Sequence, residues 1–245
     1  MRGIDISHYQ EGMDLAKAGV DFVILKISES STIADPAFDR FYAQARAIGL
    51  PVGAYVFSHA LTPAAAVAEA KYAISLLNGR ELTLGLYMDV ETYQQMALAK
   101  SQLVDTTRAF RETVEAAGYI SGLYGSEYNL WTRVDPNDCG DSIVWVAHYG
   151  MEPDIPCDIW QSSNHGRVPG YNGDVDEDQA RSSRFIEMVG GKQEEPKTAE
   201  KDPIVLMLQS CMFYDGYISQ EEVTGIKTPE FRKKIVEYAA DVAAC

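Results

Sequence analysis

The chain has 245 residues, of which 46% are hydrophobic and 23% charged, and its formal net charge is −15. This composition is typical of a globular protein with a large buried core. The acidic balance, without a lysine or arginine cluster, argues against nucleic acid and anionic membranes as partners. No apolar run reaches the roughly 20 residues that cross a bilayer, so we expect no membrane insertion.

The first residues and the spacing of the cysteines are informative about the cellular compartment of the protein. The opening stretch MRGIDIS lacks a basic segment followed by an apolar one, so we expect no secretory signal peptide. The four cysteines are widely spaced and form neither a CxxC pair nor a Cys/His metal pattern: Cys139, Cys157, Cys211 and Cys245. Free thiols in a reducing compartment are the expectation.

Strands and helices are predicted to alternate along the first 187 residues. Apolar and β-branched runs predict strands at 3–7, 21–28, 52–60 and 82–90. Helical spacing and end signals predict helices at 36–48, 62–78 and 100–117, the second capped by Thr62. Further short strands are predicted at 118–125, 142–150, 157–163 and 173–178.

This order of elements predicts the fold class. Alternation with short connections favours a parallel sheet, and about eight strands in so short a chain favour closure into a barrel. The later strands lack full helices between them, so the barrel would be irregular. We therefore predict an α/β fold, a TIM-like (β/α)5β3 barrel over residues 1–188.

A change in composition predicts the end of the barrel. Residues 189–203 are rich in glycine, proline and charge and are predicted to form a linker. Residues 204–245 regain an apolar pattern, and we expect a small helical C-terminal segment there, with its last helix capped by Thr228. So short a segment makes a marginal core, so it either docks on the barrel or is a minimal binding module.

Acidic residues recur at the predicted strand ends. Asp89 and Glu91 end the fourth strand, where residues i and i+2 point to the same face. Asp174 and Asp176 lie in the last strand, which closure makes a neighbour of the first strand and of Asp5. An isolated pair of this kind is more often a solvated strand end. Several such ends on one barrel face favour a site instead.

Clustered carboxylates have a specific chemistry. Like charges in a confined, partly buried mouth raise the pKa of at least one carboxyl and keep a proton available near neutral pH. Enzymes that cleave glycosidic bonds usually use a pair of carboxyls, one protonated and the other ionised. The catalytic candidates are therefore Asp5, Asp89, Glu91 and Asp176.

Aromatic residues in or just after the strands strengthen the interpretation of a sugar ligand. Sugar rings present C–H faces that stack on aromatic rings, although core packing is the alternative for each residue. The candidates are Tyr55, Phe57, Tyr124, Trp145, Tyr149 and Trp160. We predict no metal and no cofactor, although an oxygen cluster could suit Mg²⁺ or Ca²⁺. His148 is expected to be a hydrogen-bonded structural or subsite residue.

Seven segments of the chain resemble, in order, those of family 25 glycoside hydrolases, the N-acetylmuramidases of the Chalaropsis lysozyme type. They are GIDIS, FVILKISES, VGAYVFSHA, YMDVE, GYISGLYGS, VWVAHY and WQSSNHGRVPGYNGDVDED. The resemblance covers residues 3 to about 180 and implies an irregular eight-stranded barrel. It also implies hydrolysis of the β-1,4 bond between N-acetylmuramic acid and N-acetylglucosamine in bacterial peptidoglycan.

The resemblance also implies residue roles. Glu91 would be the general acid that protonates the leaving oxygen. Asp89 would orient the 2-acetamido group of the substrate or stabilise the developing positive charge. Asp5 and Asp176 would hold substrate or tune the pKa of Glu91. Direct attack by water and attack by the acetamido oxygen both stay open, with the i, i+2 pair favouring substrate assistance.

Four positions depart from the family pattern. Ser162 stands where an aromatic residue often follows WQ, Tyr171 and Glu177 stand at positions more often aliphatic, and Ser30 replaces a common glycine. None of them is one of the four carboxylates. These departures bear on subsite detail and not on the reaction class.

A wall-degrading barrel without a signal peptide resembles a phage endolysin, held in the host cytoplasm until a holin opens the membrane. Residues 204–245 would then bind the cell wall or dock on the barrel. These residues have a faint likeness to small helical peptidoglycan-binding repeats, and the alternative is a helical extension without an assigned function. The alternatives are a chitinase-like hydrolase of N-acetylglucosamine polymers and a non-catalytic wall-binding protein. The oligomeric state stays unknown.

Overall fold

The computed structural model describes residues 1–134 and 140–190, together with residues 208–209, 211–212, 234–235 and 238. The chain divides into two compact units, Met1–Lys192 and Gln193–Cys245. Most of the predicted linker 189–203 and of the predicted helical segment 204–245 lies outside the described residues, so both stay predictions. Among the described residues, no helix is long and apolar enough to cross a membrane.

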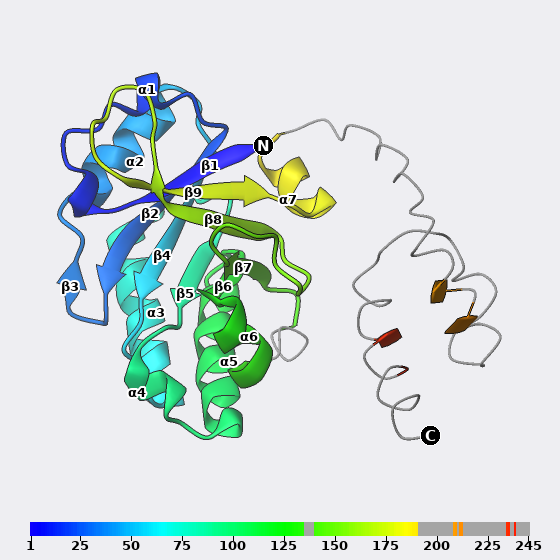
Figure 1. Cartoon of the computed structure of the whole chain (residues 1–245). Coiled ribbons are helices and arrows are strands. Elements are labelled where there is room, and N and C mark those ends of the chain that lie inside the picture. Colours follow the sequence, from blue (N-terminus) through cyan, green and yellow to red (C-terminus); the bar gives the residue numbers. More distant parts are fainter. Residues whose placement is uncertain (135–139, 191–207, 210, 213–233, 236–237, 239–245) are drawn as a thin grey trace. The chain divides into compact units, whose positions relative to one another are not determined.

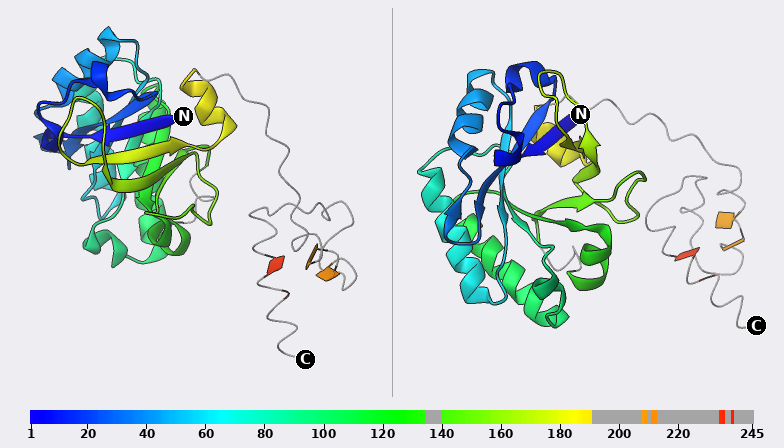
Figure 2. Two further views of the ribbon diagram at one scale, coloured as in Figure 1. Left: turned by 45° about the horizontal axis from the view of Figure 1, so that its top comes forward. Right: turned by 60° about the vertical axis from the view of Figure 1, so that its left-hand side comes forward.

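Eight strands of the first unit form a closed barrel (Figures 1 and 2). They are β1 (Arg2–Ile6), β2 (Phe22–Glu29), β4 (Val52–Phe57), β5 (Leu86–Asp89), β6 (Ser121–Ser126), β7 (Ile143–Ala147), β8 (Ile159–Gly166) and β9 (Val175–Ala180). The barrel closes because β1 pairs with both β2 and β9. The two-residue strand β3 (Ile33–Ala34) pairs only with β2. The predicted irregular α/β barrel is confirmed.

The direction of the last strand corrects the expectation of a parallel sheet. Apart from the two-residue β3, the strands from β1 to β8 pair in parallel around the barrel, but β9 runs antiparallel to both β8 and β1. Residues 167–174 alone connect β8 to β9. A parallel return needs a crossover of a dozen or more residues, so this short connection allows only a hairpin.

The three long helices match their predicted positions: α2 (Phe38–Ala47), α3 (Pro63–Leu77) and α5 (Lys100–Ala116). Thr62 caps α3 by accepting a hydrogen bond from the Ala65 backbone at 3.3 Å. The long helices lie outside the barrel along β2, β4, β5 and β6 (Figure 2). The shorter helices were not predicted: η1 (His8–Gln10), α1 (Leu15–Ala18), α4 (Tyr93–Met96), α6 (Glu127–Arg133) and α7 (Ser183–Met188).

Large aromatic side chains fill the barrel interior beneath its mouth. Phe22, Tyr87 and Trp145 are all almost fully buried in this interior cluster. Two glycines make the space for the rings. A Cβ at Gly3 would lie 2.2 Å from the Phe22 ring, and one at Gly122 would lie 2.1 Å from the Tyr87 ring. The interior is therefore a packed floor and not a channel.

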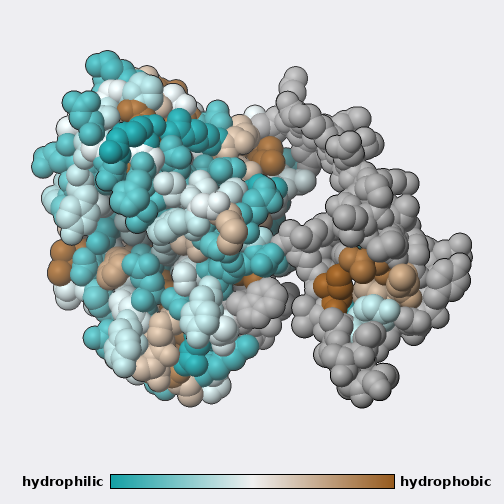
Figure 3. All heavy atoms as spheres, viewed as in Figure 1, coloured by the Kyte–Doolittle hydropathy of each residue, from teal (hydrophilic) through white to brown (hydrophobic). Residues whose placement is uncertain are grey.

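A second apolar layer joins the outer faces of the strands to the helices. It includes Leu25, Met88 and Leu123, which alternate with the inward-facing residues of their strands. The face of this unit seen in Figure 3 is mostly hydrophilic, with scattered hydrophobic residues, as the acidic composition leads one to expect. This double layer fixes the strand ends that carry the site.

Candidate active site

The structure brings the predicted carboxylates together at the carboxyl ends of the parallel strands. A cavity of about 380 Å³ there is lined by Asp5, Asp89, Glu91 and Asp176, and by Tyr55, Phe57, Tyr124, Trp145 and Tyr149. All four catalytic candidates and five of the six aromatic candidates therefore share one cavity. Asp174 does not: it precedes β9 and pairs with His165 and Arg167 on the surface.

The DVE segment supplies two of the carboxyls. Asp89 is 4% exposed at the end of β5, and Glu91 follows it with Val90 buried behind them. Burial and the neighbouring Glu91 raise the pKa of Asp89 well above its ordinary value. Partial burial likewise raises the pKa of Glu91, which stays accessible from the cavity. Glu91 is thus suited to keep a proton and deliver it.

A buried glutamine fixes the turn after Glu91. The side chain of Gln95 accepts hydrogen bonds from the Thr92 backbone at 3.1 Å and from its hydroxyl at 2.8 Å. Its amide donates to the Ser58 hydroxyl at 3.1 Å. Ser58 in turn donates to Glu69 of α3 at 2.6 Å. The turn that positions Glu91 is therefore tied to the loop after β4, and through it to α3.

Among the described residues, one lysine lines the cavity that holds Asp89 and Glu91. Lys26 of β2 is 8% exposed and lines the same cavity. Its ammonium lies 3.0 Å from the Glu29 carboxylate and 4.9 Å from the centre of the Phe57 ring. The positive charge of Lys26 lowers the pKa of both Asp89 and Glu91, against the larger effect of burial. Lys26 therefore makes both carboxyls more acidic than burial alone would leave them.

Asp5 and Asp176 face each other across two antiparallel strands. They are direct partners in the β1–β9 register, as closure of the barrel predicted. Burial and the neighbouring carboxyls raise the pKa of Asp5 well above its ordinary value. Burial and Glu91 raise the pKa of Asp176 to about 6. The mouth therefore retains protons near neutral pH.

A second cavity of about 680 Å³ adjoins the first and shares Glu91, Tyr124 and Tyr149 with it. Its other lining residues come mostly from the start of α6 and the end of β7: Ser126, Glu127, Tyr128, Thr132, Ala147, His148 and Asp154. Nδ1 of His148 contacts Oε2 of Glu127. The two cavities form one groove, with Glu91 at the junction and with carboxyls and aromatic rings along both parts.

The comparisons with known proteins bear on this groove. The amino-acid sequence matches the model of glycosyl hydrolases family 25 over residues 4–171. The chain belongs to glycosyl hydrolase family 25. As a member of that family it is a glycoside hydrolase of the lysozyme class, the enzymes that hydrolyse peptidoglycan.

Two curated relatives of this family 25 chain are lysozymes. The autolytic lysozyme of Clostridium acetobutylicum is 25% identical over an alignment of 250 residues, which covers 97% of this chain and 72% of that protein. Lysozyme M1 of Streptomyces globisporus is 28% identical over 205 residues, 75% of this chain and 68% of that protein. The enzyme class predicted from the sequence is confirmed.

Solved structures share the fold. The bacterial lysozyme from Streptomyces coelicolor superposes with a TM-score of 0.67 at 26% identity, covering 77% of this chain and 96% of that chain. The catalytic domain of endolysin ply40 from bacteriophage P40 of Listeria monocytogenes superposes with a TM-score of 0.70, covering 78% of this chain and 98% of that chain. Its identity of 23% supports likeness of fold alone.

One predicted aromatic residue lies elsewhere in the family 25 barrel. Trp160 is not among the residues that line either cavity of the groove. Its indole N–H donates to the His148 carbonyl at 2.7 Å, and the Arg181 guanidinium lies 5.5 Å from its ring centre. Trp160 neighbours the inward-facing Gln161 along β8, so it points to the outer face of the barrel.

Sequence reasoning missed two buried polar residues of the site. Gln161 donates to Asp5 at 2.7 Å and accepts from the Tyr124 and Tyr149 hydroxyls at 2.9 Å each. Asp178 is fully buried and accepts from the Trp145 indole N–H at 2.8 Å. The WQ pair and the acidic alternation of the last strand were visible signals of both positions.

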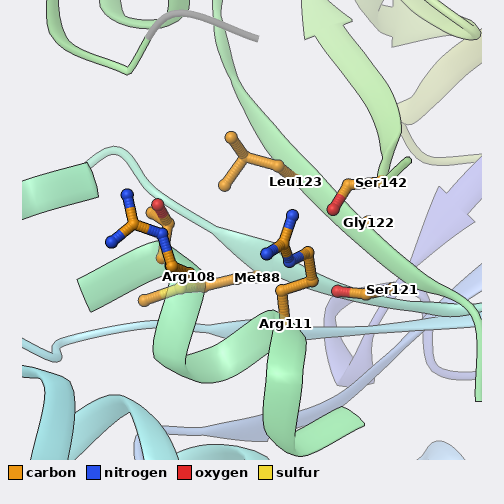
Figure 4. Close-up of a pocket in the computed structure, with 8 residues that line it drawn as sticks. Met88, Arg108, Arg111, Ser121, Gly122, Leu123 and Ser142 are labelled. Carbon is orange, nitrogen blue, oxygen red and sulfur yellow. The ribbon is translucent and has the colours of Figure 1, made fainter. Parts of the chain in front are cut away.

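A further cavity lies outside the barrel wall, between α5 and β6 (Figure 4). Figure 4 shows Arg108 and Arg111 of α5 opposite Ser121 and Leu123 of β6. Its volume of about 10 Å³ has room for no more than about one water molecule. It shares no lining residue with the groove. It is therefore no candidate for the substrate.

Proposed function

We propose that the protein cleaves the β-1,4 bond between N-acetylmuramic acid and N-acetylglucosamine in peptidoglycan, with Glu91 as general acid. The observation that carries this proposal is the place of Glu91, which lines both cavities of the groove. A bond that spans the two cavities would pass beside its carboxyl. The raised pKa of Glu91 favours the protonated form that must meet the leaving oxygen.

The two ends of the groove suit different halves of the substrate. Positive charge develops on the sugar whose anomeric carbon is attacked, and carboxylates stabilise that charge. The acidic cavity of Asp5, Asp89 and Asp176 therefore suits this sugar. The second cavity adds Tyr128 to the shared Tyr124 and Tyr149, and it suits the leaving sugar, whose C–H face can stack on a ring.

Asp89 has a role beside the acid. Its Oδ1 is buried and has no hydrogen-bond partner among the described residues. A buried acceptor of this kind calls for a donor, and the N–H of a 2-acetamido group would supply one. The acetamide would then present its oxygen to the anomeric carbon. This supports the substrate-assisted route, with Asp89 as the orienting partner.

We further propose a role in bacterial cell lysis. The support is the likeness to the autolytic lysozyme of Clostridium acetobutylicum, together with the shared fold of a phage endolysin. Release of the enzyme from the host cytoplasm by a holin belongs to the same proposal. Residues 204–245 would then bind the wall or dock on the barrel.

Digestion of purified cell walls tests the reaction. The products are reduced with borohydride and analysed by mass spectrometry, and we expect the new reducing ends on N-acetylmuramic acid. New ends on N-acetylglucosamine would mean a glucosaminidase, and release from chitin alone would mean a chitinase-like enzyme. Wall binding without any fall in turbidity would mean a non-catalytic protein. Each of these three outcomes overturns the proposal.

A variant tests the assigned acid. Glu91→Gln should lose about 10²–10⁴ of the turnover rate, because an amide cannot donate the acid proton. The matched control is Glu112→Gln, an exposed residue of α5 remote from the groove, and it should keep the wild-type rate. Near-normal turnover of Glu91→Gln would remove Glu91 from the role.

A further inference from the structure

Glu127 and His148 form a carboxylate–histidine pair on the wall of the second cavity, and the proposed reaction gives neither of them a role. Glu127 is the first residue of α6, and His148 follows directly after β7. Both residues line the cavity of about 680 Å³. Nδ1 of His148 contacts Oε2 of Glu127. The pair therefore lies where the leaving sugar is proposed to bind.

The groups around the Glu127 carboxyl fix the proton of this contact. Its Oε1 accepts from the backbone N–H of Ile155 at 3.0 Å and also from the backbone N–H of Asp154. Its Oε2 faces the imidazole of His148. Two backbone donors suit an ionised carboxylate, which can only accept hydrogen bonds. The proton between Glu127 and His148 therefore belongs to Nδ1, and the carboxylate sets both the tautomer and the orientation of the ring.

The other nitrogen of the His148 ring is the one that the groove can reach. Nδ1 is buried, whereas the side chain as a whole keeps 28% of its surface exposed and lines the cavity. Nε2 has no hydrogen-bond partner among the residues that the structure describes, and unlike Nδ1 it is not buried. Nε2 is therefore available to a ligand in the second cavity.

The backbone of His148 is held in place as well as its ring. Its N–H donates to the Gln161 carbonyl at 3.1 Å, and its carbonyl accepts from the Trp160 indole N–H at 2.7 Å. Both partners belong to β8, so the residue is fixed to the barrel wall next to Tyr149. A group that is already fixed loses little conformational entropy when it binds a ligand. His148 is thus built to offer one nitrogen at one place.

We propose that His148 is a specificity-determining residue, whose Nε2 forms a hydrogen bond with a hydroxyl group of the leaving sugar while Glu127 holds Nδ1. A hydroxyl group can donate to a neutral imidazole or accept from a protonated one, so the contact does not depend on the charge of the ring. One nitrogen of His148 is then structural, and the other belongs to a subsite. This inference rests on the proposed function for the identity of the sugar, an N-acetylhexosamine.

Nitrogen NMR of the histidine side chains tests the orientation of the ring without any substrate. Above the pH at which the ring titrates, His148 should be the Nδ1–H tautomer. Glu127→Gln should convert it into the Nε2–H tautomer, because the amide oxygen still accepts from the backbone and the NH2 group then donates to Nδ1. An Nε2–H tautomer in the wild-type enzyme, or an unchanged tautomer in Glu127→Gln, would overturn the proposal.

Added N-acetylglucosamine tests the ligand. This monosaccharide has no bond that the enzyme could cleave, so the readout does not depend on the reaction. An excess of it should move the Nε2 signal of His148 and leave that of His59 in place, because His59 lines neither cavity of the groove. An unmoved His148 signal would overturn the inference, whereas the proposed bond is decided separately by the digestion of cell walls.

Two substitutions of His148 separate its contact with the sugar from its contact with Glu127. In His148→Asn the amide can take the place of Nδ1 but is too short to replace Nε2, whereas in His148→Gln the amide reaches the place of Nε2. We expect KM for soluble glycan strands of the wall to rise about two- to tenfold in His148→Asn with kcat unchanged, because a uniform binding contact is lost. His148→Gln should stay within about twofold of the wild-type KM.

Other results of this variant pair would contradict the role. A wild-type KM in His148→Asn would mean that Nε2 does not bind the substrate, and a fall in kcat alone would mean that His148 does not act through binding. Equal impairment of His148→Asn and His148→Gln would mean that the ring is only structural. Thermal unfolding establishes that both variants are folded, and the NMR measurements on the wild-type enzyme decide the question if they are not.

Discussion

Gln161 ties the aromatic wall of the groove to Asp5, and its replacement by leucine gives a quantitative test of that link. The side chain is 2% exposed and makes hydrogen bonds to Tyr124, Tyr149 and Asp5. Leucine fills a similar volume but can make none of these bonds. The change therefore removes polar contacts with little change in packing.

The loss of stability can be worked out bond by bond. Tyr149 is exposed enough to turn its hydroxyl to water, whereas Tyr124 is 7% exposed and would keep an unpaired hydroxyl. A buried unpaired group costs about 1–3 kcal/mol of unfolding free energy. The bond to Asp5 is worth about 1.5–3 kcal/mol more, but only while Asp5 is ionised. Its loss should raise the pKa of Asp5 further, because a donor to the ionised form is removed.

The loss of stability should therefore grow with pH. Asp5 has a higher pKa in the folded than in the unfolded state, so the folded protein binds more protons between the two values. The free energy of unfolding accordingly falls as the pH rises from about 3.9 through the folded pKa. Because Gln161→Leu raises the folded pKa further, it should cost about 1–3 kcal/mol near pH 4 and about 2.5–6 kcal/mol at pH 8.

Urea unfolding at the two pH values, followed by tryptophan fluorescence, measures these costs. The acidic limb of kcat/KM should also move to higher pH. The control is Gln102→Leu, which removes a single exposed hydrogen bond of 3.0 Å to the Leu61 carbonyl and should cost little at either pH. Equal destabilisation at both pH values, with an unmoved acidic limb, would refute the bond between Gln161 and an ionised Asp5.

Three further changes test the mouth and the floor. Lys26→Met should move the pH optimum of the turnover rate upward, because Lys26 lowers the pKa of Asp89 and Glu91. The exposed Lys71→Met is the control, and an unchanged pH profile of Lys26→Met would contradict the prediction. Ser30→Gly should stabilise the protein by up to about 1 kcal/mol and so raise its thermal midpoint, because Ser30 has φ +53°. A lower midpoint would count against backbone strain at Ser30. Gly122→Ala should cost about 1–3 kcal/mol or more in urea unfolding, because its Cβ would meet the Tyr87 ring, and wild-type stability would contradict this.

The carboxylate site could be predicted because the deciding information is local or follows from closure. Asp89 and Glu91 are two apart on one strand, so their common face follows from strand geometry. The pairing of Asp5 with Asp176 follows once the barrel closes. Ser30, which the resemblance places where a glycine is common, has a positive φ of 53°, a conformation that glycine adopts more readily.

The rest depends on which way each side chain points, and composition does not reveal that. Trp160 and Gln161 are adjacent, yet only Gln161 faces the groove. The pairing of β8 with β9 is irregular after Gln161, so the alternation of inward and outward side chains cannot be followed along the sequence there. The acidic alternation of the last strand marks Asp178, but its full burial follows from Gly3 and Trp145 on other strands. The reversal of β9 was not predicted, although the short connection from β8 implies it.

Because β9 is reversed, the segment that joins it to β8 at the edge of the groove is a hairpin loop that can be exchanged. The connection 167–174 is a hairpin tip beside the groove, and two hydrogen bonds join it to the start of the chain. The Gln10 amide donates to the Asp174 carbonyl at 3.3 Å, and the Tyr171 hydroxyl donates to the Tyr9 carbonyl at 3.0 Å. A hairpin tip can change length without unpairing either strand. Tips grafted from other family members therefore offer a way to alter which wall glycans enter, while the carboxyls of β1, β5 and β9 stay in register.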